Sequence, residues 1–217
     1  VEILKEIDPP MRLHSIQNPA QEAKEDGLAR RPVLQGEAQR LAVAAFWVKV
    51  HHFGGSLSAA DIVTALYFYR MRYAPHDPTW AERDRFVMSK GHSVPAQYAA
   101  LAMLGVFPLE ELATLKQLGS RLQGHPAMHA TPGLEGCTGA LGEGLSYANG
   151  IALAARIRGL SCNVYCLLGD GELQEGQVWE AAMTSARHCL GNVVAIVDRN
   201  GLKAMDETRC SKLLDPL

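Results

Sequence analysis

The sequence predicts an α/β fold, in which a doubly wound, mostly parallel sheet carries helices on both faces. Two nearly continuous apolar stretches, at residues 163–168 and 193–197, have the length and composition of buried strands. A helical pattern over residues 176–190 lies between them, and a crossover of this length joins parallel strands with a right-handed connection. Both stretches end in polar turn residues, at the sheet edge where folds of this class bind ligands.

Ahead of these strands, the chain divides into an irregular start and a patterned domain. Residues 1–35 are polar and contain several prolines, and we expect an extension or arm over the surface. The domain at residues 36–217 begins with apolar residues at helical spacing. After a glycine pair, Ser58 stands three residues before Asp61, as in a capping box, which predicts a helix that opens there and ends near Arg72.

The middle of the domain alternates short elements with turns. A short strand is predicted at residues 85–89, followed by helices at 95–104 and 109–118. A stretch rich in glycine and proline over residues 119–144 leads into a helix of small residues that ends near residue 158. Two explanations of that helix remain open, namely close packing against the sheet and a subunit interface.

The composition excludes several classes of function. Hydrophobic residues make up 47% and charged residues 20% of the chain, as in ordinary globular proteins. The formal net charge of -2 gives no global field that would attract nucleic acid or an anionic membrane. We find neither a membrane-spanning apolar run nor the pattern of a signal peptide, and five cysteines without zinc spacing indicate reduced thiols, so we expect a cytoplasmic protein.

Polar residues at the ends of the two apolar strands form the candidate site. Asp170 follows the first strand and Asn200 follows the second, one strand–helix–strand unit later. Their side-chain oxygens, a backbone carbonyl and phosphate oxygens would together suit Mg²⁺. Gly169 and Gly171 allow the backbone to approach a phosphate closely. Gly-Asp-Gly and Asn-Gly are each common turns, but their joint placement predicts a divalent metal with a diphosphate.

Four segments of the chain carry longer, distinctive motifs: VYCLLGDGELQEGQVWEA at 164–181, DRFVMSKGH at 84–92, GHP at 124–126 and TGALGEG at 138–144. Together they resemble the transketolase family. The resemblance extends in order over residues 36–203, and it implies the thiamine-diphosphate-binding fold of the family's diphosphate-binding (PP) domain. Deoxyxylulose-phosphate synthases and dehydrogenase E1 chains share the metal motif but resemble this sequence less closely.

The resemblance implies a set of ligands for thiamine diphosphate and its metal. Asp170, Asn200 and the backbone carbonyl of Leu202 would hold Mg²⁺, or Ca²⁺ or Mn²⁺ in its place. Asn200 would also belong to the cofactor site. Gly171 and His92 would contact the diphosphate.

Further positions match cofactor and substrate contacts of the family. The backbone at Gly139, Ala140 and Leu141 would touch the cofactor, and Glu175 would lie near the dimer interface and couple two active sites. For catalysis, the resemblance implies two histidines near the substrate, His52 and His125. The sequence departs from the family around His52, where the expected Gly-His-Pro-Gly reads HHFG at 51–54.

The resemblance implies transfer of a two-carbon ketol unit from a ketose or its phosphate to an aldose or its phosphate. In the family a second, pyrimidine-binding domain supplies a glutamate that activates the cofactor, and these 217 residues leave no room for it. We therefore expect a split transketolase whose C-terminal subunit carries that domain, in an α2β2 assembly; a truncated gene product or a partial chain is the competing explanation. A component of a dehydrogenase E1 or a synthase, and a non-catalytic remnant that binds a partner, are the alternative functions.

Overall fold

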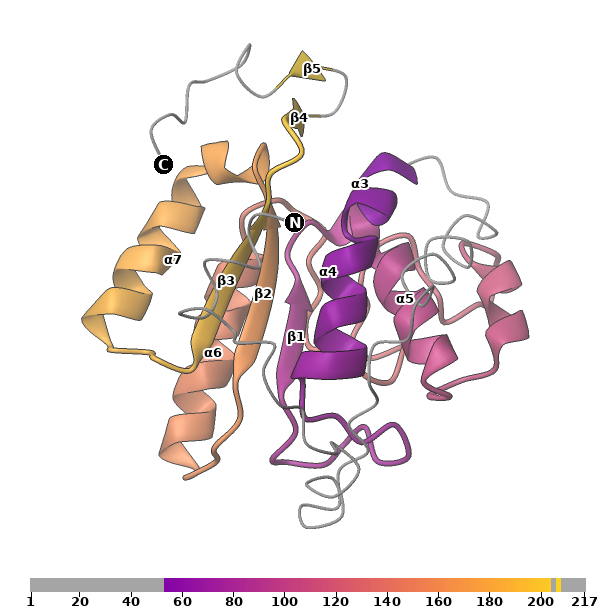
Figure 1. Ribbon diagram of the computed structural model, residues 1–217, viewed down its shortest axis with the longest axis horizontal. Helices are drawn as coiled ribbons and strands as arrows, with labels where there is room; N and C mark the ends of the chain where they lie inside the picture. The colour runs from indigo at the N-terminus through magenta and orange to yellow at the C-terminus, as the bar shows by residue number, and fades with distance from the viewer. Residues whose placement is uncertain (1–52, 204–205, 208–217) are drawn as a thin grey trace, which may run out of the picture.

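Three parallel strands form the centre of the protein, in the spatial order β1-β2-β3 (Figure 1). They are β1 Arg85–Met88, β2 Val164–Gly169 and β3 Val193–Asp198. The computed structural model describes residues 53–203 and 206–207. Within these ranges the predicted α/β class and the predicted strands are confirmed; the extension at 1–35, His52 and Cys210 lie outside the described residues.

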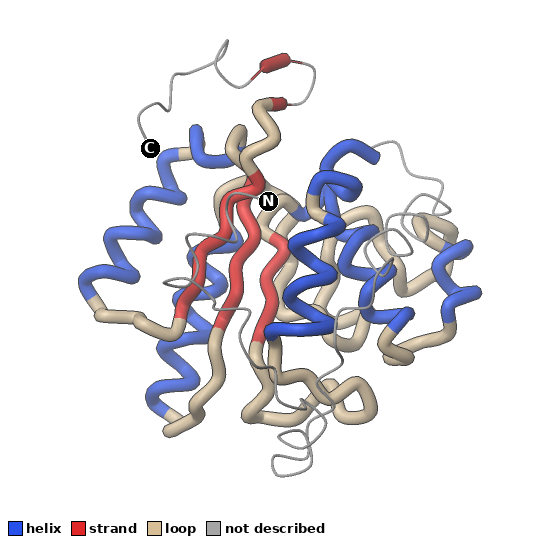
Figure 2. Tube along the Cα trace, in the orientation of Figure 1, coloured by secondary structure: helices blue, strands red, loops and turns tan. Residues whose placement is uncertain are grey.

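Helices cover both faces of the sheet (Figures 1 and 2). On one face lie α6 Gly144–Ile157 and α7 Gly176–Arg187. On the other lie α3 Phe53–Ser58, α4 Ala60–Ala65 and α5 Val94–Met103. Successive side chains of a strand point to opposite faces, so nearly every residue of β2 is buried against one helix layer or the other.

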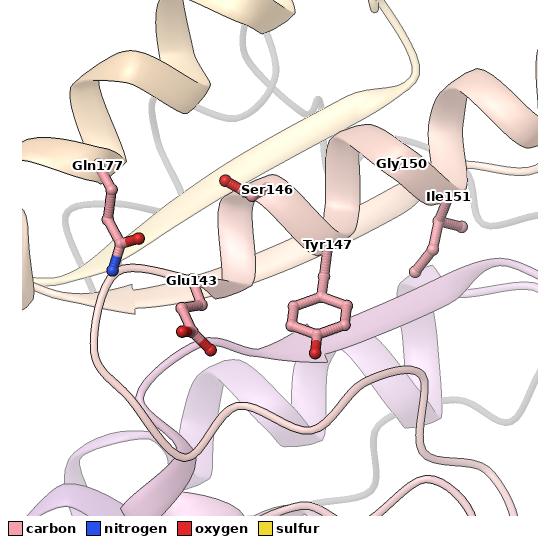
Figure 3. A pocket seen from close by; sticks show the side chains of 6 residues that line it. All are labelled: Glu143, Ser146, Tyr147, Gly150, Ile151 and Gln177. Atoms are coloured by element: carbon pink, nitrogen blue, oxygen red, sulfur yellow. The ribbon is translucent and has the colours of Figure 1, made fainter.

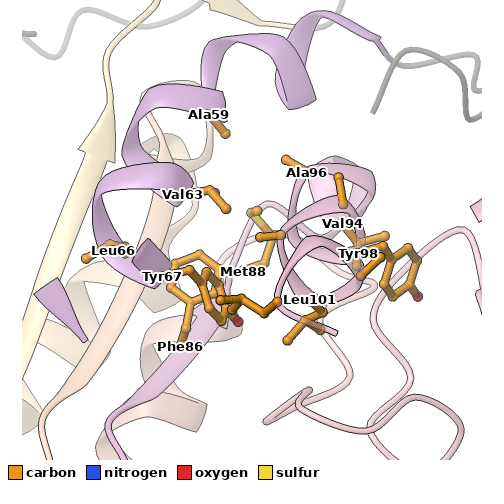
Figure 4. Packing of buried hydrophobic residues seen from close by; sticks show 14 of the residues in the cluster. Ala59, Val63, Leu66, Tyr67, Phe86, Met88, Val94, Ala96, Tyr98 and Leu101 are labelled. Atoms are coloured by element: carbon orange, nitrogen blue, oxygen red, sulfur yellow. The ribbon is translucent and has the colours of Figure 1, made fainter. Parts of the chain in front are cut away.

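The α4–α5 face holds a core of large side chains (Figure 4). Phe86 and Met88 of β1 pack there with Tyr67 and Tyr98 from the helices. The rings of Tyr67 and Phe86 meet edge to face, with centroids 5.5 Å apart, a favourable arrangement for aromatic pairs. Pro95 suits the first turn of α5 because the leading helical N–H groups need no intrahelical partner.

The α6–α7 face is packed with smaller side chains. Ala148 and Ala152 of α6 and Ala181 of α7 are buried against Val87 and Cys166 of the sheet. Short side chains let these helices approach the strands closely, which agrees with the small-residue pattern at the sequence level. None of the described helices is long and apolar enough to span a bilayer.

Two predicted helices differ from the structure. Ser58 ends α3 instead of capping the next helix, because its hydroxyl donates to Asp198 Oδ2 at 2.5 Å and also lies 3.1 Å from the carbonyl oxygen of Gly55. The helical chain then continues through α4 into the π-helix η2, Leu66–Arg70. The segment predicted as a helix at 109–118 is the shorter 3₁₀-helix η4, Leu109–Thr114, and Lys116 beyond it has a left-handed φ of 60°.

Candidate functional site

The carboxyl ends of the three strands meet at one edge of the sheet, the upper edge in Figure 1. β2 ends at Gly169, which is paired in register with Asp198, the last residue of β3. Asp170 therefore leaves the sheet beside the turn that contains Asn200. The two strand ends therefore lie next to each other, as expected for a doubly wound fold, and the convergence of the Asp170 and Asn200 side chains on one metal stays a prediction.

The carboxylate of Asp170 contacts the turn after β3 directly. Its Oδ2 accepts a hydrogen bond from the N–H of Gly201 at 2.8 Å, and its Oδ1 accepts one from the N–H of Gly171 at 2.9 Å. Gly201 has a φ of +74°, which glycine adopts without strain. The side chain of Asn200 lies on the solvent side, where its Nδ2 donates to Ser58 Oγ at 3.3 Å.

The oxygen atoms at this edge are of the kind that a hard divalent cation prefers as ligands. Each carboxylate oxygen of Asp170 accepts one backbone N–H in the contacts above and retains further acceptor capacity. The adjoining turn holds Asn200, whose side chain includes an amide oxygen, and Leu202 begins the two-residue strand β4, Leu202–Lys203, within the same segment. The described residues contain no cluster of three His, Cys, Asp or Glu side chains suited to a metal. A metal here would therefore use amide and backbone oxygens beside Asp170. β4 pairs antiparallel with β5, Asp206–Glu207.

Behind the turn, a buried ion pair ties β1 to β3. Lys90 Nζ forms a salt bridge with Asp198 Oδ2, and the two side chains are 4% and 8% exposed. Ser58 Oγ donates to the same oxygen at 2.5 Å, while Lys90 also donates to the carbonyl of Gly55 at 3.2 Å. Because an unpaired buried charge is strongly destabilising, this network fixes the ends of both strands relative to α3.

Close backbone approach brings His92 beside the loop at 138–142. A Cβ added to Gly91 would lie 1.7 Å from the carbonyl oxygen of Thr138, so the contact requires glycine. His92 lies in the 3₁₀-helix η3, Gly91–Ser93, is half-buried, and borders Gly55. Residues 139–140 next to this contact are exposed.

The end of the same loop packs against the start of α7. Gly142 has a φ of +84°, and a Cβ added to it would lie 3.0 Å from the Cβ of Glu175. Gln177 Nε2 donates to the carbonyl of Leu141 at 2.8 Å. Glu175, at the N-cap of α7, is thereby placed beside the predicted cofactor-contacting segment.

Of the two predicted catalytic histidines, only His125 lies within the described residues. His125 is exposed, and its carbonyl accepts a hydrogen bond from Tyr98 Oη of α5 at 3.5 Å. Among the described residues no hydrogen bond links His125 to the Asp170 turn. His52 precedes the first described residue.

A family model described as "Transketolase, thiamine diphosphate binding domain" matches residues 41–215. The chain belongs to this family. The resemblance found in the sequence is thereby confirmed, and so is the assignment to a thiamine-diphosphate-binding domain.

Curated relatives within the transketolase family include proteins named as subunits. The chain is 46% identical over 168 residues to "6-deoxy-6-sulfo-D-fructose transketolase subunit SqwG" of Clostridium sp. (strain MSTE9), covering 77% of this chain and 61% of that protein. It is also 46% identical over 170 residues to a subunit of the apulose-4-phosphate transketolase of Phocaeicola vulgatus, covering 78% of this chain and 60% of that protein. The chain thus spans less than two thirds of the length of these relatives.

Solved transketolase structures share the fold. The transketolase from Leishmania mexicana superposes with a TM-score of 0.77 at 33% identity, covering 85% of this chain and 30% of that one. The transketolase from Campylobacter jejuni gives the same TM-score and identity. The described helices and parallel sheet are therefore those of the family's thiamine-diphosphate-binding domain.

Beside the site, this transketolase-family domain carries an open groove of about 520 Å³ along α6 (Figure 3). Tyr147 and Ile151 project from the same side of the helix, and Glu143 and Gln177 border its end near Gly142. Tyr147 is 39% exposed although it is aromatic. The groove therefore presents apolar surface next to the predicted cofactor loop.

Three buried charged residues near the site were not predicted as site residues. They are Lys90, Glu172 and Asp198, each less than a tenth exposed. A recognisable signal exists for Lys90 and Asp198, because they lie at strand ends, where a charge is buried only when it has a partner. Glu172 lies three residues past the end of β2 and carries no such signal. Lys90 and Asp198 are far apart in the sequence, and so are Glu172 and two of its partners, Ser89 and Gly142, so these pairings could not be inferred.

The expectation of small buried thiols is confirmed for the two cysteines around β2 and is wrong for the other two described cysteines. Cys162 and Cys166 are buried, whereas Cys137 and Cys189 are exposed, and all four are free. Burial, and secondarily the negative charge of Glu172, raise the pKa of the Cys166 thiol well above its usual range. Cys166 is therefore a neutral packing residue and not a nucleophile.

Proposed function

We propose that this chain is the diphosphate-binding part of a transketolase that moves a two-carbon ketol unit from a ketose or its phosphate to an aldose or its phosphate. The contact between the Asp170 carboxylate and the Asn200 turn carries this proposal. Similarity to proteins named as transketolase subunits supports it. The proposed compartment is the cytoplasm, which agrees with the free described cysteines.

In this proposal, the oxygens of Asp170, Asn200 and the Leu202 carbonyl hold Mg²⁺, for which Ca²⁺ or Mn²⁺ can substitute. Gly171 and His92 adjoin the bound diphosphate. When bound, thiamine diphosphate supplies an electron sink for cleavage of a carbon–carbon bond.

Other residues of the chain orient the cofactor and handle protons. The backbone at 139–141, which follows the contact between Gly91 and Thr138 and is exposed at its first two residues, is proposed to contact the cofactor. His52 and His125 are proposed to exchange protons with hydroxyls of the sugar substrates, because imidazole titrates near neutral pH. Glu175 is proposed to lie at an interface between subunits.

We further propose that a separate subunit with the pyrimidine-binding domain completes the enzyme, in an α2β2 assembly. Two observations support a partner of this kind. The matched relatives are named as subunits, and the groove on α6 exposes Tyr147 next to the cofactor loop. An exposed apolar groove beside a site is typical of an interface.

Calorimetric titration of thiamine diphosphate, with and without Mg²⁺, tests the metal assignment in the complex with the partner chain. Asp170→Ala is expected to abolish Mg²⁺-dependent binding, because the carboxylate supplies the charged ligand. Asp170→Asn, which retains the shape, should weaken it. Asp61→Ala, which removes an exposed aspartate of α4, is the matched control. Circular dichroism checks that each variant is folded, and wild-type Mg²⁺ dependence in Asp170→Ala contradicts the assignment.

Activity assays separate the proposed reaction from its alternatives. The reconstituted complex should transfer a ketol unit between sugar phosphates and should not decarboxylate 2-oxo acids. Decarboxylation without ketol transfer indicates an E1-like component. Absence of Mg²⁺-dependent cofactor binding in the complex indicates a non-catalytic remnant.

A further inference from the structure

A buried carboxylate two residues after Asp170 joins three separate segments of the site. Glu172 lies in the 3₁₀-helix η5, Glu172–Gln174, and is 3% exposed. Its Oε1 accepts hydrogen bonds from Ser89 Oγ at 2.5 Å and from the N–H of Gly142 at 2.7 Å. Its Oε2 accepts one from the N–H of Gly169 at 3.0 Å.

Each of these donors belongs to a different element of the candidate site. Ser89 immediately follows β1 and precedes Lys90, Gly142 ends the loop at 138–142, and Gly169 is the last residue of β2. Ser89 is 83 residues from Glu172 along the chain, and Gly142 is 30 residues away. A single side chain therefore contacts all three.

The chemistry of these contacts requires a carboxylate. An ionised carboxylate is purely an acceptor, with two oxygens and about four lone-pair directions, so it accommodates three donors at once. A carboxamide of the same shape has one acceptor oxygen and turns an NH₂ group toward at least one N–H. Glu172→Gln consequently leaves the amide of Gly142 or of Gly169 without its acceptor.

The surrounding packing leaves little room for a rearrangement. A Cβ added to Gly144, the first residue of α6, would lie 2.3 Å from Ser89 Oγ. Gly142 is buried and has a left-handed φ. Because the loop end is tightly enclosed, a lost hydrogen bond cannot be replaced by a small local shift.

We propose that Glu172 is a positioning residue that holds the 139–142 loop and the Ser89–Gly91 turn at a fixed distance from Asp170, so that the diphosphate site is formed before the cofactor binds. The inference rests on the proposed function, since it assigns the fixed geometry to cofactor binding. If Glu172 only stabilised the fold, its substitution would loosen all elements of the domain alike.

Hydrogen–deuterium exchange of the cofactor-free, full chain tests the geometric part. In Glu172→Gln, peptides covering 139–144 or the end of β2 should exchange about tenfold faster, which corresponds to the loss of one buried hydrogen bond. Peptides of α5 should be unchanged. Glu110→Gln, at an exposed glutamate of η4, is the matched control. Equal acceleration in every peptide, or none, overturns the proposal.

Titration with thiamine diphosphate and Mg²⁺ in the complex with the partner tests the functional part. Glu172→Gln should raise the Kd of the cofactor about tenfold or more, with Mg²⁺ dependence retained. At saturating cofactor, kcat should stay within about threefold of wild type. Wild-type affinity in Glu172→Gln overturns the proposal. If the wild-type complex itself binds no cofactor, the proposed function fails and the assigned role of Glu172 fails with it, whatever the exchange data show.

Discussion

On one face of the sheet the strands meet their helices through aromatic and other large side chains, and on the other face they meet them through small ones. Tyr67, Phe86 and Tyr98 dominate the α4–α5 face, while Ala148 and Ala152 dominate the α6 contact. Every residue of α5 from Val94 to Ala102 is buried. The layer of α6 and α7 instead exposes large apolar side chains: Tyr147, Ile157, Trp179 and Met183.

This difference separates two roles within one domain. The α4–α5 face is closed within the chain, so its large side chains serve stability. The α6–α7 face is packed with small side chains, and its outward apolar side chains are not buried in the isolated chain. The groove along α6, into which Tyr147 and Ile151 project together, is an exposed apolar surface of the kind that marks association, so the α6–α7 face is the one we expect a partner to cover.

The largest expected effect comes from truncating a large side chain in the α4–α5 face. Phe86→Ala should lower the free energy of unfolding by about 3–5 kcal/mol, because it leaves a cavity in a packed aromatic cluster. Phe86 is 1% exposed. Urea unfolding measures the change. Leu109→Ala, at a residue that is 51% exposed, is the control. An equal loss of unfolding free energy in both variants would contradict a stabilising role for the α4–α5 face.

Enlarging a small side chain tests how tightly the α6–α7 face is packed. Ala152→Leu should destabilise the chain by about 1–3 kcal/mol, since extra methylene groups at a 0% exposed position force α6 away from the sheet. Ala154→Leu, on the exposed side of the same helix, should change stability by less than about 0.5 kcal/mol. Urea unfolding of the pair gives the comparison, and a tolerated Ala152→Leu would show that the face is not tightly packed.

A charge placed in the α6 groove tests whether a partner covers that face. Tyr147→Asp should weaken association with the partner chain by about tenfold or more, because a carboxylate loses its hydration in an apolar contact. Stability of the chain alone should hardly change. Analytical ultracentrifugation measures the association. Leu118→Asp, at a fully exposed leucine away from α6, should associate normally; unaltered assembly of Tyr147→Asp places the partner elsewhere.

The smallest effects concern tyrosines of the closed face. Burial raises the pKa of Tyr73 and of Tyr98 to about 12, against about 10 in an unfolded chain. The folded state therefore holds more protons above pH 10 or so, and the free energy of unfolding should fall as the pH rises from about 10 to 12. Below about pH 10 this contribution is fully present.

Two phenylalanine variants resolve the tyrosine contributions. Tyr73 Oη has no hydrogen-bond partner within the described part of the chain, so Tyr73→Phe should cost less than about 0.5 kcal/mol at pH 7. Tyr98 Oη donates to the carbonyl of Gln123 at 3.1 Å, so Tyr98→Phe should cost about 1 kcal/mol. Each variant should reduce the alkaline loss. Urea unfolding at pH 7 and at alkaline pH measures both effects, and an undiminished alkaline loss would assign it to other groups.

Local sequence patterns were sufficient to predict the strands and the helix that position the candidate site. The apolar runs of β2 and β3 and the small-residue pattern of α6 predicted those elements to within a few residues, because periodicity and burial act locally. The position of Asp170 at a strand end followed from the same reasoning, together with the rule for parallel sheets.

Contacts between distant segments were beyond local reasoning. Ser58 has the pattern of a helix cap, yet Asp198, 140 residues away, binds its hydroxyl instead. Glu172 looks like an ordinary turn residue until Ser89 and Gly142 are placed around it. In both cases the tertiary partner determines the role of a residue whose neighbours in sequence suggest another.

The ion pair between Lys90 and Asp198 also has a consequence for the order of folding. Its partners are 108 residues apart, and contacts of such separation form late because a long loop must be closed first. During synthesis, α3 and β1 emerge from the ribosome well before β3. We therefore expect the ligand-binding edge to be completed only after the last strand has docked, so a nascent chain that stops before β3 carries the α5 core without a finished site.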